Sequence, residues 1–229
     1  MTAREAFEFS AAAVRRRFHR WEIGVDGAIH AIAIAAGLVG VVALLLIASR
    51  TGGASDVAAV AIYSAGLIAM LGCSCAYNLG RFTRHADWLK HLDHSAIFLM
   101  IAGTYTPFTV LDLEGAWRWS LTGTVWTVAV ASVALRLFHS RLFDRVSLAL
   151  YLALGWLGVI ALPPLIEALD TPALVLLAVG GGLYTAGLIF HLWQRLPFQN
   201  AIWHGFVIAG AATHFAAIVI SLAASSGPA

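Results

Sequence analysis

The sequence predicts an all-α membrane protein: a bundle of seven transmembrane helices with its N-terminus in the cytoplasm and its C-terminus outside. Two features of composition support this fold class, because 60% of the 229 residues are hydrophobic and only 11% are charged. Soluble domains are about 45–50% apolar and about 25% charged. A water-soluble globule of this length could not cover its surface with 14 basic and 12 acidic side chains.

Seven apolar stretches follow one another along the chain, each close to the roughly 20 residues that the hydrocarbon core of a bilayer requires. They are continuous and rich in alanine and leucine, which favours helices over the alternating pattern of spanning strands. Pro163 and Pro164 are expected to break the fifth stretch near its outer end. The stretches cover residues 27–49, 55–79, 92–111, 117–138, 146–169, 172–193 and 201–223.

The chain divides into three parts of unequal size. Residues 1–26 form a basic segment, which we expect either to lie as an amphipathic helix on the membrane surface or to be a disordered tail. Residues 27–224 form the seven-helix membrane domain, and residues 225–229 a short C-terminal tail. The sequence contains no linker long enough to separate two folded domains.

Basic residues set the expected orientation. Seven spans place the N-terminal segment on the same side as the second, fourth and sixth loops, and that side holds every basic residue except Arg50 and Arg118. Because positive charge in short loops stays in the cytoplasm, the pattern predicts a multi-pass protein with its N-terminus inside and its C-terminus outside. A net charge of +2 and a single lysine, Lys90, argue against nucleic-acid binding.

Polar side chains inside the spans gather at the predicted cytoplasmic ends of four helices. Several are four residues apart, so each pair shares one helix face and can point into the bundle. Together they would suit a metal ion or an ordered water; alternatively, they reflect the ordinary polarity of interfacial helix ends. These candidates are Asp26 and His30 in the first span, Ser74 and Asn78 in the second, Asp93 and His94 in the third, and Asn200 and His204 in the seventh.

Four strings, spread from the first span to the last, resemble the bacterial hemolysin III-like branch of the progestin and adipoQ receptor family. The resemblance implies seven spans, an N-terminus inside and a zinc site near the cytoplasmic face. It also implies kinship with a superfamily of membrane hydrolases that includes the alkaline ceramidases. The strings are DGAIH (26–30), SCAYN (74–78), LDHSAIFLMIAGTYTPF (92–108) and NAIWHGFVIAGAATHF (200–215).

Carrying the family's site over by position exposes a departure. Ser74 and Asp93 match its serine and its water-supporting aspartate, which makes them the catalytic candidates. His204 matches one of three zinc-ligating histidines, but Asn78 and Asn200 occupy the other two positions. Zinc prefers nitrogen, sulfur or carboxylate ligands, whereas a neutral amide oxygen suits harder cations. With His204 and Asp93 as the remaining metal candidates, we expect a metal-poor site unless His30 or His94 joins it.

The resemblance favours a multi-pass protein of the bacterial inner membrane with membrane lipids as partners. It would act in membrane lipid or energetic homeostasis, or bind a lipid without turning it over. The first alternative is a lipid amide hydrolase in which a surviving metal activates water. Haem binding through membrane-embedded histidines and transport are further alternatives. A retinal protein is excluded because its Schiff base needs a lysine within a membrane-spanning helix, and Lys90, the single lysine, is expected in the loop before the third span.

Overall fold

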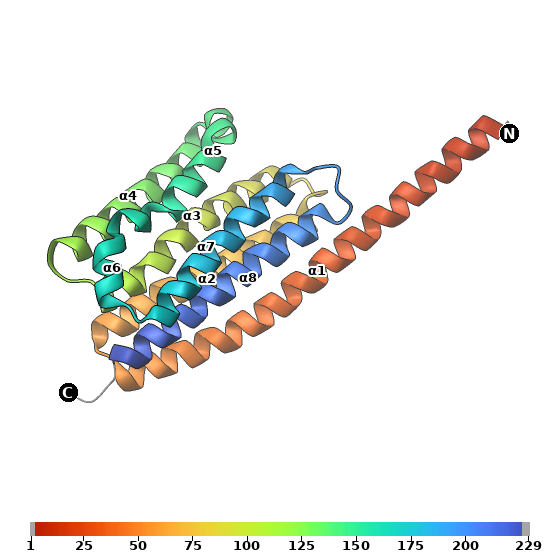
Figure 1. Ribbon diagram of the computed structural model, residues 1–229. Helices are drawn as coiled ribbons and strands as arrows, with labels where there is room; N and C mark the ends of the chain where they lie inside the picture. The colour runs from red at the N-terminus through yellow and green to blue at the C-terminus, as the bar shows by residue number, and fades with distance from the viewer. Residues whose placement is uncertain (1–2, 226–229) are drawn as a thin grey trace.

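The computed structural model describes the backbone of residues 3–225 and the side chains of residues 21–50 and 52–224. Over this range the chain is all-α, and seven helical segments are long and apolar enough to cross a membrane. The predicted fold class is confirmed at this level, whereas the direction in which the bundle is inserted stays a prediction. Figure 1 shows the helices lying side by side, with the C-terminal ends of the first and the last helix at the same end of the bundle.

The helices match the predicted stretches to within a few residues at most boundaries, and the largest differences are extra turns at the N-terminal ends of the first, third and fifth spans. The elements are α1 (Ala3–Thr51), α2 (Ala54–Gly80), α3 (Ala86–Leu111), α4 (Gly115–Phe138), α5 (Ser140–Gly155), the 3-10 turn η1 (Leu157–Ala161), α6 (Leu162–Ala168), α7 (Thr171–Leu192) and α8 (Gln199–Ser225).

Helix α1 runs without interruption through the expected boundary at residue 26. Among the residues whose side chains are described, Trp21–Arg50 is long and apolar enough to cross a membrane. The N-terminal part of α1 projects beyond the other helices (Figure 1). The side chains of residues 1–20 lie outside those described, so an amphipathic face on this segment stays a prediction.

The expected break in the fifth span is present, but it begins before the prolines. Helix α5 ends at Gly155, and Pro163 lies in the first turn of α6, where its missing N–H costs no hydrogen bond. The hydroxyl of Tyr105 donates to the carbonyls of Leu154 and Gly155, at 3.1 and 3.0 Å, and accepts the N–H of Gly158 at 2.8 Å. One side chain of α3 therefore satisfies the backbone groups freed by the break.

Small residues bring the inner helices close together. A Cβ added to Gly66 of α2 would lie 3.3 Å from the carbonyl oxygen of Leu99, and one added to Gly103 of α3 would lie 3.3 Å from that of Ile62. Such close approach of backbones is typical of helix packing in membranes. Helix α1 packs along both α2 and α8. One face of α1 is therefore directed toward α2 and α8, the helices that carry the sequence-predicted site residues Ser74 and His204.

The two ends of the bundle differ in charge. The end formed by the loops between α2 and α3, α4 and α5, and α7 and α8 holds Arg81, Arg84, Arg141 and Arg195, and we call it the basic end. At the opposite end, Asp112 follows α3, and its two carboxylate oxygens accept hydrogen bonds from the Ser221 hydroxyl at 2.8 and 2.7 Å. Burial raises the pKa of Asp112 to about 6, with Asp170 adding to the rise and the Ser221 hydrogen bond opposing it.

This carboxyl should make stability depend on pH. Because its pKa is higher in the folded state than the ordinary 3.8, the folded protein holds the proton more tightly, and stability falls as pH rises through about 6. Wild-type protein in detergent should therefore melt a few degrees higher at about pH 5 than at about pH 7.5, relative to Asp112→Asn. The asparagine variant keeps an acceptor for the Ser221 hydroxyl. The same change of melting temperature with pH in wild type and Asp112→Asn would contradict this prediction.

Candidate functional site

Four buried polar side chains from three helices meet inside the bundle near the basic end. Helix α1 contributes Asp26 and His30, α2 contributes Ser74 and α8 contributes His204, and each residue is less than a tenth exposed. The spacing of Asp26 and His30 places both on one face of α1, the face that packs against α2 and α8. We call these four residues the polar cluster.

The members of the polar cluster contact one another. His204 bridges α1 and α2, with Nδ1 2.5 Å from Oδ1 of Asp26 and Nε2 3.4 Å from Oγ of Ser74. His30 donates from Nδ1 to the backbone carbonyl of Asp26 at 2.8 Å, and its Nε2 lies 3.1 Å from the same Ser74 Oγ. The imidazole rings of His30 and His204 meet edge to face, with centroids 4.5 Å apart. Two imidazole nitrogens therefore converge on a single hydroxyl oxygen.

The two asparagines are placed differently from these groups. Asn78 is buried, and its Nδ2 donates to the backbone carbonyl of Ser74, one turn earlier on its own helix, at 3.0 Å. Asn200 lines a cleft at the basic end, which Asp26 also lines. The structure thus brings one of the three histidine positions implied by the resemblance, His204, together with two residues of α1.

The third span contributes one of its two candidates. Asp93 lines the same cavity as Ser74 and His204 and interacts electrostatically with His204. His94 lies elsewhere, stacked on Phe143 of α5 with ring centroids 5.9 Å apart. Successive residues on a helix point about 100° apart, which separates these two neighbours.

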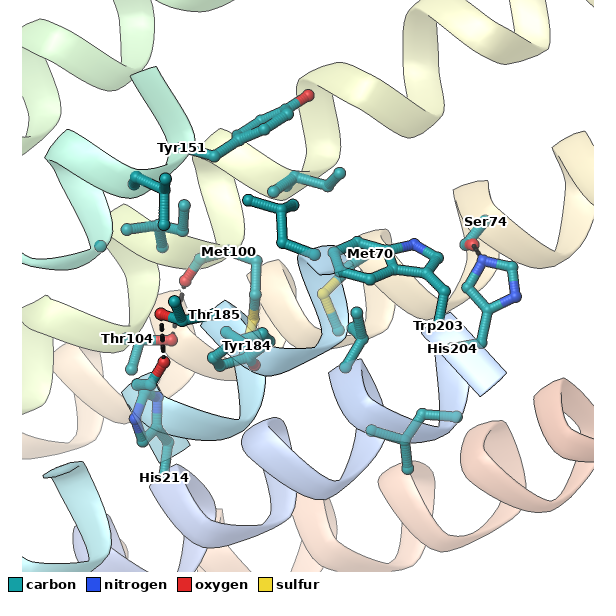
Figure 2. Close-up of a pocket in the computed structure, with 18 of the residues that line it drawn as sticks. Met70, Ser74, Met100, Thr104, Tyr151, Tyr184, Thr185, Trp203, His204 and His214 are labelled. Atoms are coloured by element: carbon teal, nitrogen blue, oxygen red, sulfur yellow. Dashed lines mark hydrogen bonds between the residues drawn. The ribbon is translucent and has the colours of Figure 1, made fainter. Parts of the chain in front are cut away.

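An apolar cavity of about 160 Å³ extends from the polar cluster into the bundle. It lies between α2, α3, α5, α7 and α8 and is walled largely by aliphatic, methionine and aromatic side chains. Figure 2 shows Ser74 and His204 at one end of the cavity, with Thr104, Tyr184 and His214 at the other. His214 donates to or accepts from no member of the polar cluster; its Nε2 contacts the carbonyl of Leu177 at 3.2 Å.

A cleft of about 340 Å³ opens at the basic end on the other side of the cluster. Charged and amide side chains line it, and Asp26 is the member of the polar cluster that it reaches. His30, Ser74 and His204 instead line the apolar cavity. The polar cluster therefore stands between a polar cleft and an apolar cavity. The polar side chains of the cleft are Glu22, Asp26, Arg81, Gln194, Arg195, Gln199 and Asn200.

The geometry bears on the haem alternative. Two axial histidines must face each other across the plane of a porphyrin. His30 and His204 instead contact each other edge to face and share a hydroxyl between them. This pair leaves no slot for a macrocycle.

Seven spanning helices and a buried histidine–aspartate–serine cluster beside an apolar cavity define a multi-pass membrane protein with an internal polar site. The chain belongs to the Haemolysin-III related family, whose model matches residues 23–215. It is 38% identical over 186 residues to Hemolysin-3 of Bacillus cereus, covering 81% of this chain and 85% of that protein. It is 35% identical to the Hemolysin-3 homolog of Bacillus subtilis (strain 168), covering 81% and 87%.

A relative outside the bacteria is also similar. The chain is 29% identical over 164 residues to the human Monocyte to macrophage differentiation factor, covering 69% of this chain and 67% of that protein. The matched family region extends from α1 to α8 and includes every member of the polar cluster. The resemblance found in the four sequence strings is thereby confirmed at the level of the family.

Proposed function

We propose that this chain binds a membrane lipid, with an acyl chain in the apolar cavity and the polar end of the lipid against the polar cluster, and that it serves lipid homeostasis in the bacterial cytoplasmic membrane. The observation that carries the proposal is the cavity itself, which is walled mainly by apolar side chains and has Ser74 and His204 at one end. Small-molecule sites have this character: an apolar lining with a few polar groups that fix orientation.

Two physical arguments support a lipid as occupant. An acyl chain in the cavity would make van der Waals contacts with the lining side chains, and these contacts are missing when the cavity is empty. A carbonyl or hydroxyl placed at the polar end would find imidazole and hydroxyl partners there, whereas the aliphatic walls offer none. The arginines of the basic end favour a cytoplasmic position for that end, so the lipid headgroup would face the cytoplasmic leaflet.

Hydrolysis of the bound lipid is the second candidate function, and the polar cleft favours it. The cleft reaches Asp26 from the basic end, while the apolar cavity reaches Ser74 and His204 from within the bundle. Water and a lipid amide or ester could thus approach the cluster from opposite sides. In such a reaction Ser74 and Asp93 would orient the water or the carbonyl.

Filling the cavity tests lipid binding. Ile208 of α8 lines the cavity, and Ile208→Trp should remove most of the space an acyl chain would occupy. Ile189 of α7 is 63% exposed on the surface of the bundle, so Ile189→Trp is a matched control. After purification in detergent and extraction of bound lipid, mass spectrometry should detect several-fold less tightly held lipid in Ile208→Trp than in wild type or Ile189→Trp.

Equal lipid content in the two tryptophan variants and wild type would overturn the proposal. Lipid that adheres to the outer surface of the bundle should be present in similar amounts in Ile189→Trp and Ile208→Trp, so it does not account for a difference between them. The thermal unfolding of each variant, measured in the same detergent, identifies a loss of lipid that follows only from misfolding.

A further inference from the structure

We propose that Asp26, His30 and His204 together bind one divalent metal ion, best matched by zinc, so that helix α1 supplies the ligands absent from the asparagine positions of α2 and α8. One ligand atom from each of these three buried residues lies within 4.8 Å of the other two. Two imidazoles and one carboxylate are a common ligand set of catalytic zinc, which keeps a further position open. The residues present therefore fit the metal by donor chemistry and by spacing.

The hydrogen bonds of His30 and His204 orient their nitrogens for this purpose. A backbone carbonyl only accepts, so His30 carries its proton on Nδ1 and presents a bare Nε2 to the cluster. Nδ1 of His204 and the Asp26 carboxylate contact each other, so a cation bound by both would take the place of the proton that they share. Metal-ligating histidines are typically held through their other nitrogen, as His30 is by the Asp26 carbonyl.

Ser74 contacts both imidazoles, with Nε2 of His30 and Nε2 of His204 lying 3.1 and 3.4 Å from its Oγ. With a cation on Nδ1 of His204, that imidazole carries its proton on Nε2 and donates it to Oγ. With the same cation on Nε2 of His30, the Ser74 hydroxyl has its own proton free for a bound water or carbonyl.

Charge points the same way. The cluster region contains two carboxyl groups, those of Asp26 and Asp93, and among the described residues neither forms a salt bridge with lysine or arginine. The salt-bridge partners of Asp26 are the two histidines of the cluster. A divalent cation would balance the buried carboxylate of Asp26 and the half-buried one of Asp93. The polar cleft, which reaches Asp26 from the basic end, provides an aqueous path for the ion.

In this arrangement neither asparagine supplies a ligand, and two of the three ligands come from α1. The Asn78 amide donates to its own helix backbone, and Asn200 lines the cleft. The sequence leaves two histidines, His30 and His94, that could join the site. His30 contacts His204, whereas His94 is stacked on Phe143. The proposal concerns the metal alone and does not depend on which lipid occupies the cavity.

Metal analysis of the full chain tests the proposal. Wild-type protein, purified in detergent, incubated with zinc and then desalted, should retain about one zinc ion per chain by elemental mass spectrometry. His30→Gln and Asp26→Asn should each weaken zinc binding by about 10-fold or more. Asn78→Ala and His94→Gln should retain zinc, since the first removes an amide and the second a histidine outside the polar cluster.

A spectroscopic measurement covers the case in which a variant fails to fold. Wild-type protein loaded with cobalt(II) should show visible absorption of a site with nitrogen and oxygen ligands, and added zinc should remove it. Lipid content is measured on the same samples: His30→Gln that loses zinc but keeps its lipid separates this proposal from the proposed function. Wild-type protein that retains no zinc, or His30→Gln that retains it fully, would overturn the metal site.

One outcome would assign the cluster a different chemistry. The contacts Asp26–His204–Ser74 also follow the order of a carboxylate, base and nucleophile relay. Zinc-free protein in which a fluorophosphonate probe labels Ser74, and labels it less in Asp26→Asn, would overturn the metal proposal in favour of that relay.

Discussion

Replacing His204 by alanine is expected to lower the melting temperature of the purified protein by about 10 °C, which corresponds to roughly 3–5 kcal/mol. His204 connects α8 to α1 through Asp26 and to α2 through Ser74. Its loss leaves the Asp26 carboxyl, whose side chain is 7% exposed, without its shortest contact. The effect is read from thermal unfolding in detergent, followed by circular dichroism or by tryptophan fluorescence.

Two further variants identify the origin of that loss. His139→Ala removes an exposed histidine between α4 and α5 and should leave the melting temperature within about 2 °C of wild type. Adding Asp26→Asn to His204→Ala should recover part of the loss, because the amide carries no charge to be left unpaired. A His204→Ala protein that melts with wild type would show that the polar cluster does not hold the three helices together.

Removing Asp144 is expected to destabilise the protein by about 2 kcal/mol, or roughly 5 °C in melting temperature, and to do so more than removing its partner Arg136. The Arg136 guanidinium is 3% exposed and lies 2.9 Å from the Asp144 carboxylate, which is 52% exposed. Asp144→Ala removes the hydrogen-bonded carboxylate of a buried cation, which then has the ring of Phe143, 5.1 Å away, and a longer-range electrostatic interaction with Asp93. Arg136→Met leaves a half-exposed carboxylate that water can solvate.

The order of three melting temperatures measures this asymmetry. Wild type should melt highest, Arg136→Met next and Asp144→Ala lowest. Asp87→Ala, which removes an exposed carboxylate in the first turn of α3, is the control for a change of surface charge. Equal losses in Asp144→Ala and Arg136→Met would contradict the account, because the burial of the guanidinium would then carry no extra cost.

The sequence predicted the spanning helices well because each is a continuous apolar run of membrane length. It also predicted that Asp26 and His30 share a face, as do Asn200 and His204, since residues four apart on a helix are neighbours. Helix ends were less predictable. Helix α1 extends from Ala3, and the fifth span breaks at Trp156, before the prolines, where Tyr105 of α3 supplies hydrogen bonds from a distant part of the chain.

Which helices meet at the site could not be predicted from spacing. Asp26 and His30 are recognisable as a pair, but only the packing of α1 against α2 and α8 shows that they face Ser74 and His204. His94 and Asp93 are adjacent in the chain, yet one contacts Phe143 and the other lines the cavity. The aromatic ring that holds His94 comes from α5, far along the sequence.

Anomalous diffraction from crystals of the zinc-loaded protein, measured on both sides of the zinc absorption edge, tests the central claim most directly. The account predicts one strong difference peak, bordered by the side chains of Asp26, His30 and His204 and next to Ser74. A peak bordered by Asn78 and Asn200 without His30, or no peak from protein soaked in zinc, would contradict it.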